Sequence, residues 1–361
     1  MVFRMGKDST NMRKFILEQG RAVKATIDEN REKVAALRFL DFKHIILSGC
    51  GDKFAVPLAC QYLYKAFGGK PLEVIHSRTL ADYPPECLGP ETLVIFLTQS
   101  GRTKDTLDAV DVAVGKGCKL MAITNLQADP NNIGEGIWRI ADHNGIVFNT
   151  STTIYPEKPT PSTQTFHSSM VLLWMVLAEL AKKDISKELG RISLMVDELT
   201  VKNEAKWKKL AKQFGRMLPA YFMGDGPRYG MAYKSAMIMA MEGVKEDSAA
   251  VMTEEFLHSS IETLEKDNRK KHSLVIFMPP QYGPLREHAE KVAKLWEKRA
   301  GRAKVLRIEP VKISADPVLD DLLSPITQMI PIEWLTYWSA RFRGTDPGKT
   351  EMVKKVRSSG F

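Results

Sequence analysis

The chain has 361 residues, 44% hydrophobic and 26% charged, which is the balance of a water-soluble globular protein long enough to form two domains. It contains no apolar run approaching the roughly 20 residues that cross a bilayer, and its N-terminus lacks the apolar core that a secretory signal requires. The formal charge of +9 suits anionic small molecules or a generally basic surface, and without a basic patch interleaved with aromatic residues it does not indicate nucleic-acid binding.

Strand-like and helix-like patterns alternate through the first half of the chain. The expected helices cover 8–38, 53–67, 107–113 and 166–182. The expected strands are 44–48, 72–75, 93–97, 120–124 and 145–149. A segment rich in Thr, Ser and Pro predicts a loop over 151–165.

The second half repeats this alternation. Its expected helices cover 185–214, 228–244 and 285–299, followed by a last apolar helix that opens near Pro331 and runs through Phe342. Its expected strands are 220–223, 274–278 and 304–308. Alternation at these lengths predicts an α/β fold in which each half is a right-handed, mostly parallel αβα sandwich.

The four cysteines lie in the first third of the chain without C-x-x-C spacing: Cys50, Cys60, Cys87 and Cys118. They indicate reduced core thiols in a cytoplasmic protein rather than disulfides or a zinc site. No His, Cys and Asp cluster has the spacing of metal ligands, so we expect no metal.

Two short patterns occur once in each half, in the same order. Leu93–Phe96 reads LVIF and recurs as Leu274–Phe277, and Gly49-x-Gly51 recurs as Gly224-x-Gly226. The matching order and similar offsets predict a duplicated domain. Neither glycine pair completes G-x-G-x-x-G, so we expect no dinucleotide and no other cofactor.

The strongest functional signal is the turn after the strand 93–97. The strand ends in Thr98–Gln99–Ser100–Gly101, and Thr103 then offers N-cap chemistry for a helix. A hydroxyl-rich turn that leads into a helix N-terminus leaves backbone N–H groups unpaired and adds partial positive charge, which suits a phosphate. The alternative is an ordinary strand-to-helix turn with capping residues.

The same turn resembles a known family. Its run T-Q-S-G-x-T-x-D-T is similar to the S-Q-S-G-x-T-x-D-T signature of the sugar isomerase (SIS) domain, in which this turn holds a sugar phosphate. The resemblance implies that Thr98, Gln99, Ser100 and Thr103 are phosphate ligands. Two such domains in one chain resemble the isomerase half of glucosamine-6-phosphate synthase and the fructosamine-6-phosphate deglycases.

On this basis we expect an N-terminal helix over 1–38, SIS domains over 39–184 and 185–343, and a tail over 344–361 that closes the active site. Each SIS domain would be an αβα sandwich around a flavodoxin-like sheet.

Glu242 and His258 match the catalytic pair of the resembling families, in which a helical Glu precedes the His of an E-x-x-H motif by sixteen residues. The E-F-x-H wording and the Met before Glu242 are closer to the deglycases. Moving a proton between C1 and C2 of a sugar needs one carboxylate over both carbons, and an apolar helix would raise the pKa of that carboxyl. The alternative places Glu242 on a solvated helix face and His258 in a loop.

Two further parts of the family pattern map less directly. The loop EKPTPST resembles E-x-x-x-A-S-T and implies sugar or phosphate contacts for Glu157, Ser162 and Thr163, against a Pro-rich surface loop. The start of the C-terminal tail at Gly344 resembles that of the synthase and implies an active-site role for Lys355, against a solvated charge run.

The sequence departs from the pattern of the synthase in two places. The synthase sequence C-G-T-S is replaced by Cys50–Gly51–Asp52–Lys53, so Gly51 and Lys53 are expected near the substrate, where Lys53 binds an anion or pairs with Asp52. Met239 stands where the synthase has a lysine, which argues against glucosamine 6-phosphate synthesis, and we expect no glutaminase activity.

We therefore expect a homodimeric cytoplasmic enzyme that cleaves a fructosamine 6-phosphate, without a nucleic-acid or membrane partner. A glucosamine-6-phosphate deaminase or isomerase, and a non-catalytic sugar-phosphate sensor, remain as alternatives.

Overall fold

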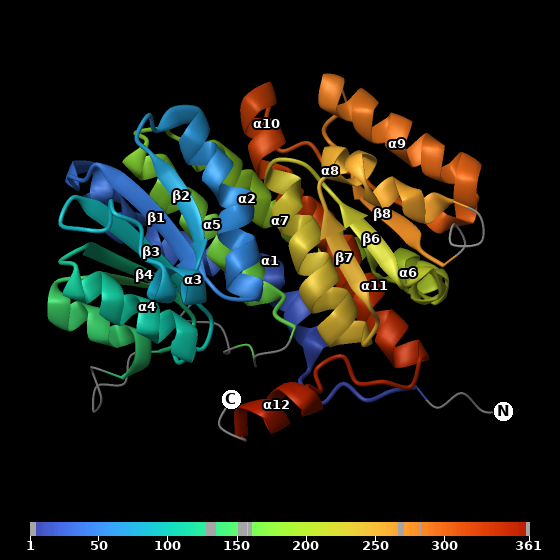
Figure 1. Ribbon diagram of the computed structural model, residues 1–361, viewed down its shortest axis with the longest axis horizontal. Coiled ribbons are helices and arrows are strands. Elements are labelled where there is room, and N and C mark those ends of the chain that lie inside the picture. Colours follow the sequence, from blue (N-terminus) through green and yellow to red (C-terminus); the bar gives the residue numbers. More distant parts are fainter. Residues whose placement is uncertain are drawn as a thin grey trace.

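Two parallel β-sheets, each flanked by helices, make up the molecule (Figure 1). The computed structural model describes residues 5–127, 135–150, 157, 161–265, 271–281 and 283–358. The first sheet has the strand order β2-β1-β3-β4-β5 and the second the order β7-β6-β8-β9, and every strand pair is parallel. The strands are β1 His44–Gly49, β2 Leu72–His76, β3 Thr92–Thr98, β4 Lys119–Thr124, β5 Ile146–Asn149, β6 Ala220–Met223, β7 Ser248–Val251, β8 Ser273–Phe277 and β9 Val305–Ile308.

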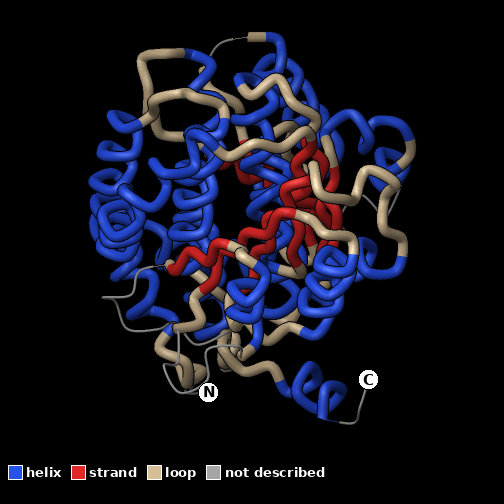
Figure 2. The backbone as a smooth tube through the Cα atoms, turned by 90° about the vertical axis from the view of Figure 1, so that its left-hand side faces the viewer, coloured by secondary structure: helices blue, strands red, loops and turns tan. Residues whose placement is uncertain are grey.

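Helices lie outside the strands around the whole molecule (Figure 2). The α-helices are α1 Met12–Ala35, α2 Asp52–Phe67, α3 Ser77–Asp82, α4 Lys104–Gly115, α5 Gln164–Leu180, α6 Ser186–Met217, α7 Pro227–Lys234, α8 Thr253–His258, α9 Pro284–Ala300, α10 Pro317–Leu323, α11 Pro325–Phe342 and α12 Glu351–Ser358. Short 3₁₀ segments are η1 Ala36–Phe39, η2 Gly136–His143, η4 Ser260–Leu264 and η6 Arg302–Lys304, and η3 Ser235–Val244 is a π-helix.

The predicted fold class is confirmed. One face of the first sheet packs against α4 and η2, and the other contributes to a large core with α1, α2 and α5, so the sheet is the middle layer of an αβα sandwich. The second sheet is covered by α8 and α9 on one face and joins the same large core on the other. The order 2-1-3-4-5 is that of flavodoxin-like folds, and the second sheet repeats its first four strands.

One hydrophobic core therefore runs between the two halves. Helix α11 packs against α6, and α1 packs against α5 and α6. Trp174 of α5 and Trp334 of α11 are completely buried, and the Trp334 indole N–H donates to the Thr200 carbonyl of α6 at 3.1 Å. None of the described helices is long and apolar enough to cross a membrane.

Several elements differ from the sequence prediction, among them α11, β7 and α10. The last apolar helix begins at Pro325, and Pro331 lies inside it. The predicted start at Pro331 was wrong because both prolines suit a first helical turn, and the sequence pattern favoured the later one. Strand β7 was not predicted, since Ser and Ala fill half-buried positions that β-branched residues usually occupy. Helix α10 was also missed, although Asp316 caps it by accepting N–H bonds from Val318 and Leu319.

Candidate active site

The predicted phosphate turn joins β3 to α4. All seven residues of β3 are buried, so the turn starts from a fixed edge of the first sheet. The Thr98 hydroxyl accepts the Gly101 N–H at 3.2 Å, and Gly101 has φ +66°, a conformation that favours glycine. Ser100 is exposed, and its hydroxyl lies 3.5 Å from that of Thr103, the N-cap residue of α4. Two hydroxyls, one of an exposed residue and one of a half-buried residue, thus lie beside a helix N-terminus.

The loop before α5 is held from inside by Glu157. Its buried carboxylate accepts bonds from the backbone N–H and the hydroxyl of Thr163 at 2.5 and 2.8 Å, and from the same groups of Thr165 at 2.9 and 2.5 Å. The Gln99 side-chain amide donates to the Glu157 carbonyl at 3.4 Å, which ties this loop to the phosphate turn. Glu157 therefore shapes the site, with both carboxylate oxygens occupied by protein donors.

Ser162 and Thr163 are buried, whereas most of the predicted loop around Glu157, residues 151–156 and 158–160, lies outside the described residues.

A buried cluster of charges lies beneath the N-terminus of α2. Asp52 accepts a hydrogen bond from Lys234 Nζ at 2.5 Å and another from the Ser162 hydroxyl. Lys234, with a completely buried side chain, also donates to the Ser162 carbonyl at 2.7 Å. Burial by itself would raise the pKa of the Asp52 carboxyl, but Lys234 and Lys53 hold it below its usual value.

Lys53 points into the protein. Its ammonium donates to the Thr165 carbonyl at 2.9 Å and to the Ser169 hydroxyl at 3.0 Å, and it lies 3.8 Å from Asp52. Burial lowers the pKa of Lys53 to about 8. Of the two possibilities open from the sequence, the geometry favours internal pairing. Gly51 is the N-cap residue of α2, with φ +53°.

Glu242 lies in the π-helix η3, which continues α7. This helix runs antiparallel to α2. A Cβ placed on Gly230 would lie 2.6 Å from the Ala55 carbonyl oxygen, and one placed on Gly51 would lie 3.9 Å from Ile238 Cδ1. The end of η3 therefore reaches the start of α2, at the carboxyl edge of the first sheet, where the phosphate turn also lies. π-Helical segments are rare and occur frequently at functional sites.

Half-buried Glu242 lines a cavity of about 1310 Å³. The N-terminal segment, η3 and the C-terminal tail form its wall: Met5, Gly6, Lys7, Ser9, Met237, Met241, Glu242, Lys245, Gly344, Thr345, Asp346, Lys349, Thr350, Glu351, Met352 and Val353. The first residues of α12 are among them. Lys355 belongs to the same short helix, although its side chain lies outside the described part of the chain.

His258 does not meet Glu242 within the chain. Glu242 precedes β7 and His258 follows it at the end of α8, so the two lie beyond opposite ends of that strand. His258 is exposed and is not part of the wall of the Glu242 cavity.

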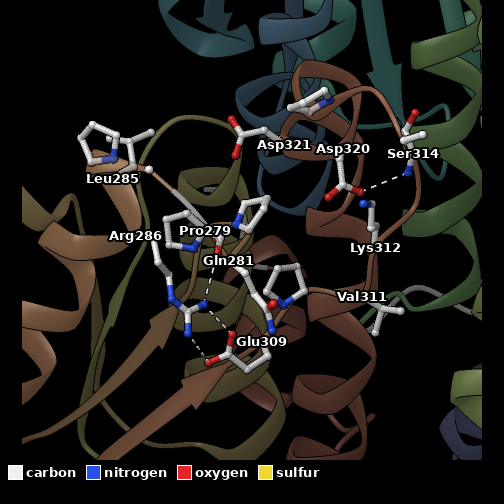
Figure 3. Close-up of a pocket in the computed structure, with 16 residues that line it drawn as sticks. Pro279, Gln281, Leu285, Arg286, Glu309, Val311, Lys312, Ser314, Asp320 and Asp321 are labelled. Atoms are coloured by element: carbon white, nitrogen blue, oxygen red, sulfur yellow. Dashed lines mark hydrogen bonds and ion pairs between the residues drawn. The ribbon is translucent and has the colours of Figure 1, made fainter.

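The second half does not repeat the phosphate chemistry of the first. The turn after β8 carries Pro279 and Pro280, which lack backbone N–H groups, and it borders a separate cavity of about 820 Å³ (Figure 3). Arg286 crosses this cavity wall to donate to the Pro279 carbonyl at 3.0 Å and to Glu309 at 2.6 Å. Of the two equivalent turns, after β3 and after β8, only the turn after β3 is rich in hydroxyl groups.

A buried acid and base lie deeper, below Lys234. His167 and Glu333 are completely buried, with His167 Nδ1 donating to the Thr163 carbonyl at 3.1 Å and lying 3.5 Å from Glu333 Oε1. Burial lowers the pKa of His167 to about 4 and raises the pKa of Glu333 well above its ordinary value. Both side chains are therefore held in their neutral forms.

His167 should make the fold sensitive to acid. A histidine with a depressed folded-state pKa contributes stability that is present above pH 6.5 and is lost as the pH falls toward 4, which amounts to roughly 3 kcal/mol. The raised pKa of Glu333 makes the fold less stable as the pH rises, which is the opposite dependence. The effect of His167 is therefore measured by comparing a His167 variant with the wild type. We expect His167→Gln to lose less free energy of unfolding than the wild type between pH 6.5 and 4, measured by urea titration. Equal losses would contradict this assignment.

Comparison with known proteins supports the same family. The model of the SIS domain matches residues 38–178. Residues 38–178 are therefore similar to the SIS domain. A relative named glutamine–fructose-6-phosphate aminotransferase (isomerizing), from Methanothermobacter thermautotrophicus, is 27% identical to it over 356 residues, covering 95% of this chain and 56% of the relative. The chain thus spans about half the length of that relative.

Two solved structures share the fold of this chain across both halves. The C-terminal domain of glucosamine-fructose-6-phosphate aminotransferase from Francisella tularensis superposes with a TM-score of 0.74 and 20% identity, covering 94% of this chain and 98% of that one. Glucosamine-6-phosphate deaminase from Thermotoga maritima superposes with a TM-score of 0.69 and 17% identity, covering 94% and 97%.

Sequence reasoning did not identify Lys234. Its signal was present, because a lysine inside a run of apolar helical residues must find a buried partner. Asp52 was noted as a departure from the family, and Lys234 explains how that carboxylate is accommodated.

Proposed function

We propose that this protein is a deglycase that cleaves a fructosamine 6-phosphate into an aldose 6-phosphate and an amine. The observation that supports the proposal is the approach of η3 to α2, in which Ile238, four residues before Glu242, lies near Gly51 at the sheet edge that bears the hydroxyl-rich turn. A carboxylate and a phosphate-binding turn on one edge suit a substrate with a reactive carbon at one end and a phosphate at the other.

The chemistry requires two proton movements followed by hydrolysis. Glu242 takes a proton from C1 and returns it to C2, while the proton on the amine nitrogen moves to the C2 oxygen. The ketosamine thereby becomes the imine of an aldose. Water then adds at C1 and the carbon–nitrogen bond breaks, so the amine leaves with the proton it requires and the aldehyde remains.

His258 is assigned to ring opening, in the active site of a neighbouring subunit. Its exposure on α8, away from the Glu242 cavity of the same chain, supports this arrangement. The active form would then be a homodimer, with Lys355 of the tail near the substrate, and Thr98, Gln99, Ser100 and Thr103 around the phosphate.

A panel of substrates tests the proposal. Purified protein is incubated with fructosamine 6-phosphates of several amino acids, with glucosamine 6-phosphate and with fructose 6-phosphate, and the products are followed by mass spectrometry. We expect glucose 6-phosphate and free amine from the fructosamine 6-phosphates alone. Ammonia released from glucosamine 6-phosphate would instead indicate a deaminase, the activity named for the Thermotoga maritima neighbour. Binding without any product would indicate a sensor.

A further inference from the structure

The cavity beside Glu242 is lined by exposed methionine and valine side chains from three separate segments. Met5 of the N-terminal segment is 47% exposed, Met237 of η3 is 41% exposed, and Met352 and Val353 of the tail are 68% and 44% exposed. Large apolar side chains scattered singly over a surface need no explanation, but a cluster around one cavity marks a binding site.

We propose that this cavity binds the amine part of the substrate, and that this amine is an amino acid with an apolar side chain. The inference rests on the deglycase function proposed above. In a fructosamine 6-phosphate the amine is attached to C1, the carbon from which Glu242 removes a proton, and the phosphate is at the opposite end of the sugar. The amine must therefore lie beside Glu242 and away from the phosphate turn.

The position of the cavity agrees with that requirement. Glu242 is part of its wall, whereas the described wall is otherwise built from the N-terminal segment, η3 and the tail, and does not include the phosphate turn. A cavity of about 1310 Å³ exceeds the size usual for drug-sized ligands, so it has room for a substituent beyond the sugar. Methionine side chains are unbranched and polarisable, and they adapt to apolar groups of differing shape.

Charges at the same cavity suit the carboxylate of an amino acid. Lys349 pairs with Glu351, and Asp346 accepts the Ser9 and Gly348 N–H groups at 3.1 and 3.0 Å. The Lys245 ammonium donates one hydrogen bond to the Glu242 carbonyl, and the same nitrogen has two further N–H donors. Together with Lys7, also in the wall, it provides positive charge for a carboxylate next to the apolar surface.

The preference for an apolar amine can be measured directly. We would determine kcat/KM for the fructosamine 6-phosphates of leucine, glycine and glutamate. Leucine adds an isobutyl group that the methionines would bury, so we expect its derivative to exceed the glycine derivative by about 10- to 100-fold, and the glutamate derivative to rank below leucine.

Paired variants locate the preference. Met237→Ser should reduce the leucine-to-glycine ratio of kcat/KM by about 5- to 10-fold, since it removes apolar surface from this cavity. Leu285→Ser is the matched control, because Leu285 is an apolar side chain 52% exposed on the separate cavity of the second half. It should leave the ratio unchanged.

Several results would overturn the inference, and they can be told apart. Equal kcat/KM for all three derivatives, or a preference for glutamate, would refute the apolar subsite while the deglycase function stands. A lack of turnover with every derivative would refute both. If Met237→Ser changed the mass of the particle in sedimentation and left the ratio unaltered, the methionines would belong to an interface between copies of the chain.

Discussion

Glu242→Gln should lose nearly all turnover of a fructosamine 6-phosphate, by about 10³-fold in kcat, while it still binds the sugar phosphate. An amide has nearly the size of the carboxylate but cannot accept a proton from C1. The phosphate turn, on a different element, would be untouched. Turnover is measured as glucose 6-phosphate formed per second, and binding of fructose 6-phosphate is measured by isothermal titration calorimetry.

Glu287→Gln provides the control for this variant, because Glu287 is an exposed glutamate in the first turn of α9, on the second half of the chain. It should keep wild-type turnover. A Glu242→Gln protein that retains more than about a tenth of the activity would exclude this carboxylate as the proton carrier, since general-base catalysis contributes about 10²- to 10⁴-fold.

The turn after β3 could be predicted because its signals are local. A strand buried at every position must be apolar along its whole length, and the hydroxyl-rich turn and N-cap follow it without interruption. The repeated LVIF segment likewise appears in equivalent strands, β3 and β8, of the two sheets. The matching strand orders support the predicted duplication.

The environment of Lys53 could not be predicted, because its partners are distant in sequence. Thr165 lies 112 residues from Lys53 and Ser169 lies 116 residues away. Asp52, next to Lys53 in the sequence, was the obvious local partner. The shortest ion pair of Asp52, however, is with Lys234, which lies 182 residues later in the chain. Local spacing identifies which groups need partners, whereas the packing of α2 against α7 decides which partners they find.

The π-helix also had no local signal. Met and Ala residues before Glu242 favour a helix, and they do not distinguish an α-helix from a π-helix. The type of helix matters for the proposed function, since the winding of η3 determines which way the Glu242 side chain faces. Glu242 was correctly expected on a helix, and whether it acts as the proton carrier stays a prediction.

Lys234→Met should cost about 3–5 kcal/mol of folding free energy, because it leaves Asp52 as a buried carboxylate without its nearest cation. Lys53, at 3.8 Å, offsets part of that loss. Lys24→Met is the matched control: its salt bridge to Asp28 is exposed on α1, and its removal should cost less than about 1 kcal/mol. Both values come from urea titrations followed by circular dichroism.

The double variant Asp52→Asn/Lys234→Met separates a loss of charge pairing from a loss of packing. If the single variant suffers from an unpaired buried charge, then removing that charge should restore a large part of the lost stability. If the double variant is no more stable than Lys234→Met, the ammonium acts mainly through its bond to the Ser162 carbonyl and its position 4.1 Å above the Phe166 ring. Because Lys234 joins the Ser162 loop to the helix that carries Glu242, either outcome identifies what holds the loop and the proposed catalytic carboxylate on one framework.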